Sequence, residues 1–574
     1  MPGFDQNIKK GFLSLAVAFA MGGCASLDRT DPAAEMAPGT TSSIPAALPT
    51  DVNPAEDASA AAVDGAAPQD PQASVEAQEE TAPFTAIDLH AHHSLFDSED
   101  EIWTRVRQGF AMPEYADEPR VQAQIDWYRC HPDFLERVTA RAEPYLHLIQ
   151  EEIEARGMPS ELLLLPVVES AYLPYAYSHG RAAGLWQFIP STGRHFGLEQ
   201  DWWYDGRRDI VASTRAALDY LQLLSKNFDG DWLLALAAYN SGQGTVKRAI
   251  ERNARRGLPT DYWNLDLPRE TEAYVPKLLA VKALVDDPEL FGIELWPVPD
   301  EPYLTEVALD SQIDLAIAAE LAGLSVEEIY LLNPAFNRWA TSPDGPTRLL
   351  LPLDSAERFQ ANLAKLPAQS RVTWRRHRIR EGENLGTIAR RYGTTIAVLK
   401  QSNGLRGNTI RAGDHLLVPT AYRANGDYNL AADQRREATQ SKPQGAVKRT
   451  HIVRPGDTFW DIARRHGVSV RQLAAWNGMA PGDVLRPGDE LVIWLPAGAS
   501  QAALRLPDMT HPLGEQTLRK VRYSVRSGDS LYRIAQRFSV EVSDIQRWNN
   551  MANGHLLRPG QPLTLYVDVT SQGS

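Results

Sequence analysis

Cysteine is scarce in this chain, which has two cysteines, Cys24 and Cys130, among its 574 residues. A disulfide-stabilised scaffold and a multi-cysteine zinc module are therefore excluded. Basic residues are also in the minority, since 58 Lys and Arg stand against 73 Asp and Glu, a net charge of −15. A chain this acidic is a poor candidate for binding nucleic acid, and we expect no such partner. The length predicts about four domains.

The apolar run at the N-terminus is short. It covers Gly11 to Met21 after Lys9 and Lys10, whereas a membrane-spanning helix needs about twenty residues. This arrangement is typical of a signal peptide. The sequence Met21-Gly-Gly-Cys24 resembles the lipobox of bacterial lipoproteins, which implies that Cys24 is acylated and that residues 1–23 are removed. The alternative is an ordinary signal peptide with an incidental cysteine.

The segment after Cys24 is acidic, and Phe84 is its only aromatic residue. Residues 25–85 hold eleven acidic residues and one basic residue, and they are rich in Ala, Pro, Ser and Thr. Such a segment cannot bury enough apolar surface to offset its ordering entropy. We expect a disordered tether over 24–85. With Ala25 after the cysteine, the lipoprotein resemblance implies the periplasmic face of the outer membrane of a Gram-negative bacterium. Cys130 is then left without a partner, and we expect it to fill a small apolar space.

The C-terminal half contains three copies of one pattern. Its copies begin at His377, His451 and Tyr523, and in each an Asn follows the first Gly by 21 residues. The apolar spacing predicts a strand, two helices and a strand in every copy. The copies resemble LysM domains, which implies βααβ modules at 375–420, 450–495 and 521–567 that bind glycans containing N-acetylglucosamine. The linkers at about 420–449 and 496–519 are polar or contain proline, which predicts semi-independent modules.

The LysM resemblance implies a glycan groove beside the turn after the first strand. In the second and third copies the candidate residues are Gly456, Asp457, Thr458, Gly528, Asp529 and Ser530. The alternative is that the repeated Gly and Asn residues only form turns. Copy one differs, because Glu383 replaces the aspartate and Ser402 replaces a tryptophan. Residues 301–353 look like a degenerate fourth module without the Gly-Asp turn, and we assign them no glycan site.

The central segment, residues 86–300, contains the candidate catalytic residue. A helix is predicted over Glu161–Tyr172, with Pro166 as a kink, and its Leu162–Val168 run is apolar on all sides. Such a helix is buried. Burial of Glu169 near its end would favour the protonated carboxyl that a general acid requires. The alternative is that Glu169 lies beyond the buried part and is solvated.

Three further motifs follow this helix. They are Gly184-Leu-Trp-Gln187, Ala238-Tyr-Asn240 and Glu270-Thr-Glu-Ala-Tyr274. Gln187, Tyr239, Asn240 and Tyr274 carry uncharged hydrogen-bonding groups that suit sugar hydroxyls and acetamides. Trp186 and Phe188 are better explained as core residues, and Tyr239 could be one too.

Together, the four motifs resemble the lysozyme-like domain of lytic transglycosylases. The resemblance implies a mainly α catalytic domain, Glu169 as the acid/base, and Ser178 in contact with the sugar at the cleavage site. It also implies that further residues line the groove: Gln187, Tyr239, Asn240, Glu270 and Tyr274. We therefore expect a multidomain protein in which a disordered tether leads to a mainly α catalytic domain and then to small α+β LysM modules.

The implied activity is cleavage of the β-1,4 bond between N-acetylmuramic acid and N-acetylglucosamine in peptidoglycan strands. Glycosidases normally use two carboxylates, whereas these motifs centre on one. A single acid/base favours an intramolecular route that gives 1,6-anhydromuramoyl ends and needs neither a cofactor nor a metal. Two alternatives stay open. One is a lysozyme-like hydrolase of the same glycan, and the other is a non-catalytic peptidoglycan-binding lipoprotein.

Overall fold

The computed structural model describes residues 101–343 and 348–495, and in the last module residues 518–525, 561–568 and a few single residues between them. The predictions for Cys24, the tether and Gly528–Ser530 lie outside the described residues. Among the residues that are described, no helix combines the length and the apolarity needed to cross a membrane.

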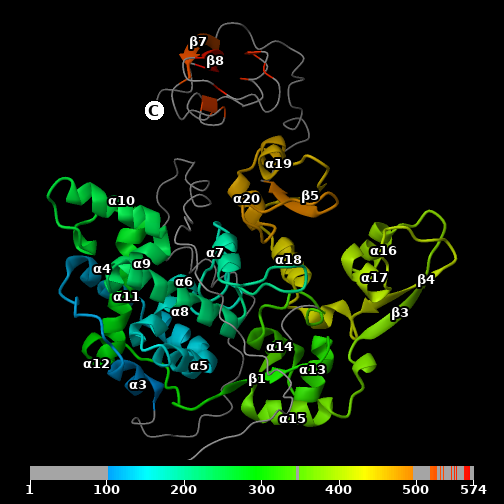
Figure 1. The fold of residues 1–574 in the computed structure, drawn as a ribbon, viewed down its shortest axis with the longest axis horizontal. Helices are drawn as coiled ribbons and strands as arrows, with labels where there is room; N and C mark the ends of the chain where they lie inside the picture. The colour runs from blue at the N-terminus through cyan, green and yellow to red at the C-terminus, as the bar shows by residue number, and fades with distance from the viewer. Residues whose placement is uncertain are drawn as a thin grey trace, which may run out of the picture. The chain divides into compact units, whose positions relative to one another are not determined.

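The first part of the described chain is a bundle of helices (Figure 1). Its helices are α3 (Ile102–Gln108), α4 (Pro119–Cys130), α5 (Pro132–Glu154), α6 (Leu165–Ser170), α7 (Pro190–His195), α8 (Ile210–Asn227), α9 (Trp232–Ser241), α10 (Gln243–Ala254), α11 (Arg269–Asp286) and α12 (Pro288–Phe291), with the 3-10 turns η3 (Ser160–Leu164) and η4 (Tyr262–Asn264). The middle of α9, from Leu233 to Ala238, is buried, and α11 packs against this helix and against α4 and α6. The mainly α fold predicted for this part is confirmed.

Side-chain caps define where the central helices begin. The Asp209 carboxylate accepts the N–H of Ala212 at the start of α8, and that of Asp231 accepts the N–H of Leu234 at the start of α9. Each cap satisfies a backbone donor that has no partner within the helix. Cys130 ends α4 and is exposed, so its predicted role as a buried filler is wrong, because the chain turns there into α5.

The predicted helix over Glu161–Tyr172 is two elements, η3 and α6. Pro166 lies in the first turn of α6, where its missing N–H costs nothing, so it does not kink a longer helix. Ala171 and Tyr172 end α6 in the left-handed region, with φ of 48° and 56°. A left-handed conformation is unfavourable for residues with a side chain. The backbone is therefore strained directly after Glu169.

Four modules follow, each with a two-stranded antiparallel sheet. Their elements are β1 (Leu304–Ala308), α13 (Leu315–Ala322), α14 (Val326–Leu332) and β2 (Arg348–Pro352); β3 (Thr373–Arg378), α16 (Leu385–Arg391), α17 (Ile396–Ser402) and β4 (His415–Thr420); β5 (Val447–Ile452), α19 (Phe459–His466), α20 (Val470–Ala475) and β6 (Glu490–Leu495); and β7 (Leu518–Ser524) and β8 (Pro562–Asp568). The βααβ order is confirmed in the modules whose helices are described. We call the first the LysM-like module and the others LysM copies one, two and three.

The repeated asparagine has a structural role in all four modules. In copy two, the Asn477 amide donates to the carbonyl of Val492 at 2.9 Å and accepts that residue's N–H at 2.7 Å. The same pair of bonds joins Asn333 to Leu350, Asn403 to Leu417 and Asn549 to Thr564. The amide thus joins the end of the second helix to the closing strand, which explains the fixed spacing of the asparagine.

The LysM-like module shares a hydrophobic core with the helical part. Trp203 and Tyr204 lie in one buried cluster with residues of the module, among them Phe336. Backbone bonds reinforce this contact: Asp205 donates to the carbonyl of Ala335 at 2.8 Å, and Asn337 donates to that of Trp203 at 2.7 Å. A domain boundary near residue 300 therefore passes through a continuous core.

The segment after copy one also packs on the LysM-like module. It forms the 3-10 turn η6 (Asn425–Tyr428) and the helix α18 (Ala432–Ser441). Tyr428, Leu430 and Ala431 are buried in the same cluster as Trp203. The first half of this predicted linker is therefore a docked strap, here defined as residues 421–431.

Candidate active site

Glu169 lies at the C-terminal end of α6, where α11 packs against it. The Tyr274 hydroxyl, on α11, donates a hydrogen bond to the Glu169 carboxyl. Burial raises the pKa of Glu169 to about 8, the Tyr274 bond acts in the opposite direction, and the negative charge of Glu270 raises it further. A carboxyl with this pKa is largely protonated at neutral pH and can act as a general acid. Glu169 itself is half-buried, so its environment lies between the buried and the solvated alternatives, and the raised pKa shows that burial has the larger effect.

The other motifs meet around this carboxyl. The Ser170 hydroxyl donates to the carbonyl of Leu185 at 2.9 Å, and the Tyr239 hydroxyl donates to the carbonyl of Trp186 at 2.8 Å. Burial raises the pKa of Tyr239, and the nearby charge of Glu169 raises it further. Tyr239 and Tyr274 are thus two hydroxyls close to Glu169, and Trp186 is a core residue, as the sequence suggested.

The Gly184–Gln187 turn depends on its glycine. Gly184 has φ of +81°, and a Cβ at this position would lie 2.1 Å from the carbonyl oxygen of Arg207. A side chain cannot fit there. Gln187 is itself left-handed, with φ of 46°, and its amide nitrogen donates to the carbonyl of Gly184 at 2.8 Å.

Asn240 and Glu270 are brought to the site through α9 and α11. The Thr271 hydroxyl donates to the Asn240 side-chain oxygen at 2.7 Å, which fixes the orientation of the amide. Thr271 was not singled out from the sequence, because one buried threonine inside a helix has no local pattern. Glu270 is exposed and acts on Glu169 through its charge alone.

Ser178 lies in the loop between α6 and the Gly184–Gln187 turn. Its hydroxyl accepts the N–H of Ala182 at 3.0 Å, so one of its roles is to hold that loop. Within the described part of the chain, neither Ser178 nor Gln187 forms a hydrogen bond with Glu169. Both residues therefore belong to the loops after Glu169, and neither is bonded to its carboxyl.

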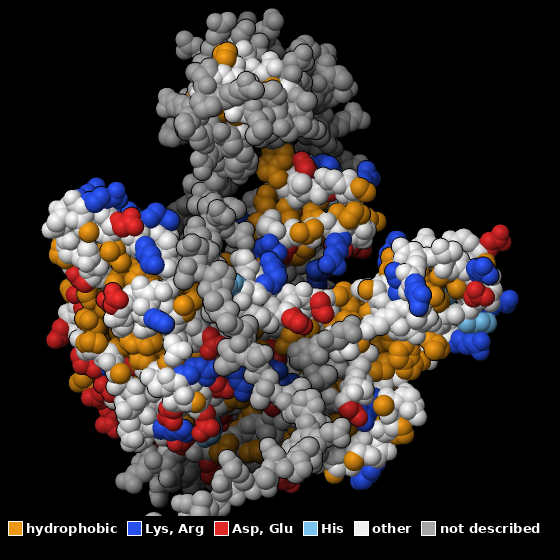
Figure 2. All heavy atoms as spheres, in the orientation of Figure 1, with side chains coloured by type: hydrophobic (Ala, Val, Ile, Leu, Met, Phe, Trp, Pro, Cys, Tyr) orange, Lys and Arg blue, Asp and Glu red, His pale blue; other side chains and the backbone are white. Residues whose placement is uncertain are grey.

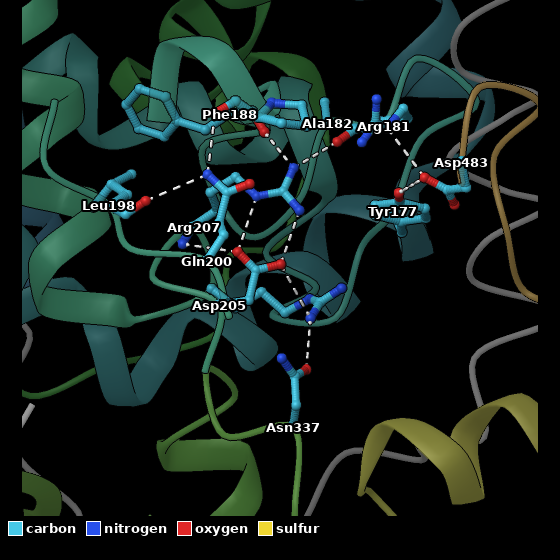
Figure 3. A network of polar contacts seen from close by, with 12 residues as sticks. Tyr177, Arg181, Ala182, Phe188, Leu198, Gln200, Asp205, Arg207, Asn337 and Asp483 are labelled. Atoms are coloured by element: carbon cyan, nitrogen blue, oxygen red, sulfur yellow. Dashed lines mark hydrogen bonds and ion pairs between the residues drawn. The ribbon is translucent and has the colours of Figure 1, made fainter. Parts of the chain in front are cut away.

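The aspartates of the 201–209 segment have structural partners. Figure 3 shows the Arg207 guanidinium bound to the Asp205 carboxylate, at 2.9 and 2.8 Å, and to the carbonyls of Arg181 and Phe188. The Asp201 carboxylate accepts backbone N–H groups of its own turn. Neither aspartate is available as a second catalytic carboxylate.

The candidate glycan residues of copy two also hold their own turn. Gly456 has φ of +89°, and the Asp457 carboxylate accepts His451 Nε2 at 2.8 Å and the N–H of Arg454 at 2.9 Å. Both bonds lower the pKa of Asp457, and the bond from His451 has the larger effect. Thr458 caps α19.

In copy one, Glu383 replaces the aspartate but makes the same bonds. Its carboxylate accepts His377 Nε2 at 2.8 Å and the N–H of Arg380 at 2.9 Å. Both bonds lower the pKa of Glu383, to about 2, and the bond from the Arg380 N–H has the larger effect. The departure of copy one from the Gly-Asp pattern therefore leaves the turn intact.

Family models match successive parts of the chain. The Transglycosylase SLT domain matches residues 147–259, the LysM-like domain of lytic transglycosylase MltD matches residues 303–368, and the LysM domain matches residues 377–419, 451–494 and 523–565. The matched stretches contain Glu169 and the repeated asparagines.

Individual proteins are similar to this chain over different lengths. Membrane-bound lytic murein transglycosylase D of Escherichia coli (strain K12) is 38% identical over 390 residues, which cover 66% of this chain and 82% of that protein. Autolysin of Enterococcus faecalis (strain ATCC 700802 / V583) is 30% identical over 186 residues, which cover 32% of this chain and 24% of autolysin. Among solved structures, the soluble lytic transglycosylase SLT70 of Escherichia coli aligns over 29% of this chain and 30% of that one, at 20% identity. Its TM-score of 0.22 is too low to support an argument.

Proposed function

We propose that this chain, which belongs to the membrane-bound lytic murein transglycosylase D family, forms 1,6-anhydromuramoyl ends with Glu169 as the only acid/base. The chain is an enzyme that binds peptidoglycan through its LysM modules. The observation that supports this most is one half-buried carboxyl that accepts a hydrogen bond from Tyr274, with its pKa raised by burial to about 8 and no second carboxylate bonded to it in the described residues. A hydrolase would need another group to activate a water molecule.

The reaction uses one proton twice. The Glu169 carboxyl donates its proton to the oxygen of the glycosidic bond, and the bond between that oxygen and C1 of N-acetylmuramic acid breaks. The muramoyl acetamide stabilises the cationic centre at C1. The Glu169 carboxylate then removes the proton of the C6 hydroxyl, and O6 bonds to C1. The Tyr274 hydroxyl stabilises the carboxylate in between, because a hydrogen bond to a charged acceptor is stronger than one to a neutral acceptor.

The remaining candidate residues bind the strand in this proposal. Tyr239, Asn240 and Gln187 offer hydrogen bonds to hydroxyls and acetamides, and Ser178 contacts the sugar at the cleavage site. Asp457 and its neighbours in copy two, with the equivalent residues of copy three, bind N-acetylglucosamine. Their supporting observation is the resemblance to LysM domains.

Product mass tests the reaction. Strands digested by the wild-type chain should release muropeptides lighter by one water than hydrolysis products. Glu169→Gln keeps the shape but cannot exchange the proton, so the rate should fall by roughly 10²–10⁴-fold or more, the contribution of a positioned acid/base. Glu251→Gln, which changes an exposed glutamate of α10 outside the four motifs, is the matched control. Reducing muramic acid ends, or an active Glu169→Gln chain, would overturn the proposal.

The pH dependence gives a second readout. Because cleavage begins from the protonated carboxyl, the rate should decline as the pH rises through about 8, by roughly tenfold per unit above it. Glu270→Gln removes a negative charge that raises the Glu169 pKa, so its alkaline limb should move to lower pH.

We further propose that lipidated Cys24 anchors the protein to the outer membrane, facing the periplasm of a Gram-negative envelope. Support comes from the lipobox resemblance and from the membrane-bound relative. A Cys24→Ala chain ending after residue 441, which lacks LysM copies two and three, should leave the membrane fraction, whereas the same chain with Cys24 should stay in it. Equal fractionation of the two chains would contradict the anchor.

A further inference from the structure

Three arginines from separate parts of the chain line one cavity. Arg208 precedes α8, Arg338 belongs to the loop before β2, and Arg435 lies on α18. Tyr175 and Ser178, from the loop that follows Glu169, line the same cavity. In Figure 2, Lys and Arg side chains gather around the position that α18 has in Figure 1.

Arg435 has no acidic partner there. Its guanidinium lies over the Tyr175 ring, 4.2 Å from the centroid, and no hydrogen bond or ion pair joins it to any described residue. Burial, with the positive charge of Arg208, lowers the pKa of Arg435 to about 10. Arg435 is half-buried, and a guanidinium partly removed from water without a bonded counter-charge is costly, so an anion bound here would stabilise it.

The neighbouring charges do not supply that anion. Asp205 binds Arg207 through both oxygens and lies 3.4 Å from Arg208, so one carboxylate serves two guanidiniums before Arg435 is considered. The Nε atoms of Arg208 and Arg338 are buried without a hydrogen-bond partner. The carboxylate paired with Arg338 belongs to Asp433, which is largely exposed, at 3.4 Å. The cavity wall therefore has an excess of positive charge and unused donors.

Guanidinium donors in this arrangement fit carboxylates. Their planar fork matches the two oxygens of a carboxylate, and stacking on an aromatic ring holds the fork in place. The stretch from Leu173 to His179, which starts four residues after Glu169, lines the cavity, and it includes Ser178, for which we propose contact with the sugar at the cleavage site. A carboxylate attached to that sugar through a peptide would reach this wall.

We propose that Arg435, with Arg208 and Arg338, binds a carboxylate of the peptide stem carried by the glycan strand during cleavage. The site deepens the proposed function and rests on it. It makes the enzyme favour strands that still carry peptides over strands without them. The acidic segment at residues 25–85 is another source of carboxylates on this chain, and the experiment below distinguishes it.

The test compares two soluble substrates with the full-length chain purified in detergent. One is uncrosslinked strands with peptide stems, and the other is the same strands after an amidase has removed the stems. Arg435→Gln should raise KM about tenfold on the first substrate, the effect of one lost charged hydrogen bond, and leave kcat and the second substrate unchanged. Arg435→Lys should retain part of the affinity, because it keeps the charge and loses the fork. Arg256→Gln, an exposed arginine outside the cavity, is the matched control for net charge.

Stability gives an independent signature. Since Arg435 is an unpaired cation in the free enzyme, Arg435→Gln should not lower the thermal midpoint and should raise it by roughly 2 °C. A residue that only supports packing would show a lower midpoint and equal losses on both substrates.

The outcomes separate the competing explanations. Equal KM changes on both substrates, or none, overturn the stem site. A lower KM on both substrates means that residues 25–85 occupy the arginines and compete with the strand, which also overturns it. If the wild-type chain makes no anhydro ends from the strands that carry stems, the proposed function has failed, and the stem site that rests on it fails with it.

Discussion

The LysM-like module and LysM copy two have the same fold, but the turn before the first helix is covered in the former and exposed in the latter. In both, an asparagine joins the second helix to the closing strand. In copy two, Thr458 caps the first helix beside Gly456, and a Cβ added at Gly456 would meet open space. In the LysM-like module, Asp314 has the capping position, is fully buried, and accepts the N–H of Tyr422 and the hydroxyl of Tyr428 from the strap.

This difference shows how one fold serves two purposes. The turn that faces solvent in copy two is covered in the LysM-like module by a segment of the same chain. The Gly-Asp pair, which a covered turn does not need, is absent there, whereas the asparagine that holds the fold remains. We infer that the LysM-like module works as a part of the catalytic unit, and the LysM copies work as its binding heads.

Truncation should have the largest effect on the catalytic unit. A chain of residues 86–300 contains every catalytic motif but exposes Trp203, Tyr204 and Tyr175. Each buried aromatic contributes about 1.5–3 kcal/mol, and domains are stable by only about 5–15 kcal/mol. We expect this chain to lose its cooperative unfolding transition in near-ultraviolet circular dichroism. A chain of residues 86–441 retains the module and the strap and should unfold cooperatively. Equal transitions in both would show that the shared core is dispensable.

The strap can be tested by one residue with a matched control. Tyr428 is 2% exposed and Tyr422 is 50% exposed, and both lie in the strap. Tyr428→Ala leaves a cavity and takes one hydrogen-bond donor away from the buried Asp314 carboxyl, and should lower the free energy of unfolding by about 3–5 kcal/mol in urea. Tyr422→Ala keeps its backbone bond and should cost less than about 0.5 kcal/mol. Similar values for the two would mean that the strap is not part of the core.

Parts of this division could be predicted from the sequence. Helical periodicity and glycine positions are local signals, so the sequence could indicate the buried run before Glu169 and the three further motifs that the structure brings together. The repeats gave the βααβ fold for the same reason. The carboxyl's hydrogen bond from Tyr274 spans 105 residues, and only the family resemblance had brought the two together.

Other parts left no local signal. The strap reads as polar linker because its buried side chains, Tyr428 and Leu430, are few, and its partner Asp314 is more than a hundred residues away. Arg435 looks like one more charge on a surface helix until Tyr175 is placed beside it. Tertiary contacts of single residues, unlike periodic faces, cannot be read from spacing.

The repeated asparagine allows the same substitution to be made in both modules, and we expect it to affect different unfolding transitions. Asn333→Ala and Asn477→Ala each remove two bonds to a strand backbone, at a cost of about 1–3 kcal/mol. Asn333→Ala should lower the main transition of the catalytic unit. Asn477→Ala should leave that transition unchanged and increase hydrogen exchange only in residues 451–494. If Asn477→Ala lowers the main transition as well, copy two is not an independent unit.

The smallest expected effect concerns acid. Bonds from His451 and the backbone lower the pKa of Asp457 in the folded state, so its contribution to stability is present above the pKa of the unfolded chain and is lost as the pH falls through the folded value. Asp457→Asn should therefore make copy two slightly less stable than the wild type at pH 7, whereas the two should be equally stable at pH 2. Hydrogen exchange of residues 451–494 measures both. Glu169 responds in the opposite direction, because its raised pKa makes the charged form unfavourable, and its cleavage is lost toward alkaline pH. The two regions would then titrate separately, because copy two loses stability in acid and the cleavage rate falls in alkali. If Asp457→Asn instead moved the alkaline limb of cleavage, copy two would be coupled to the active site.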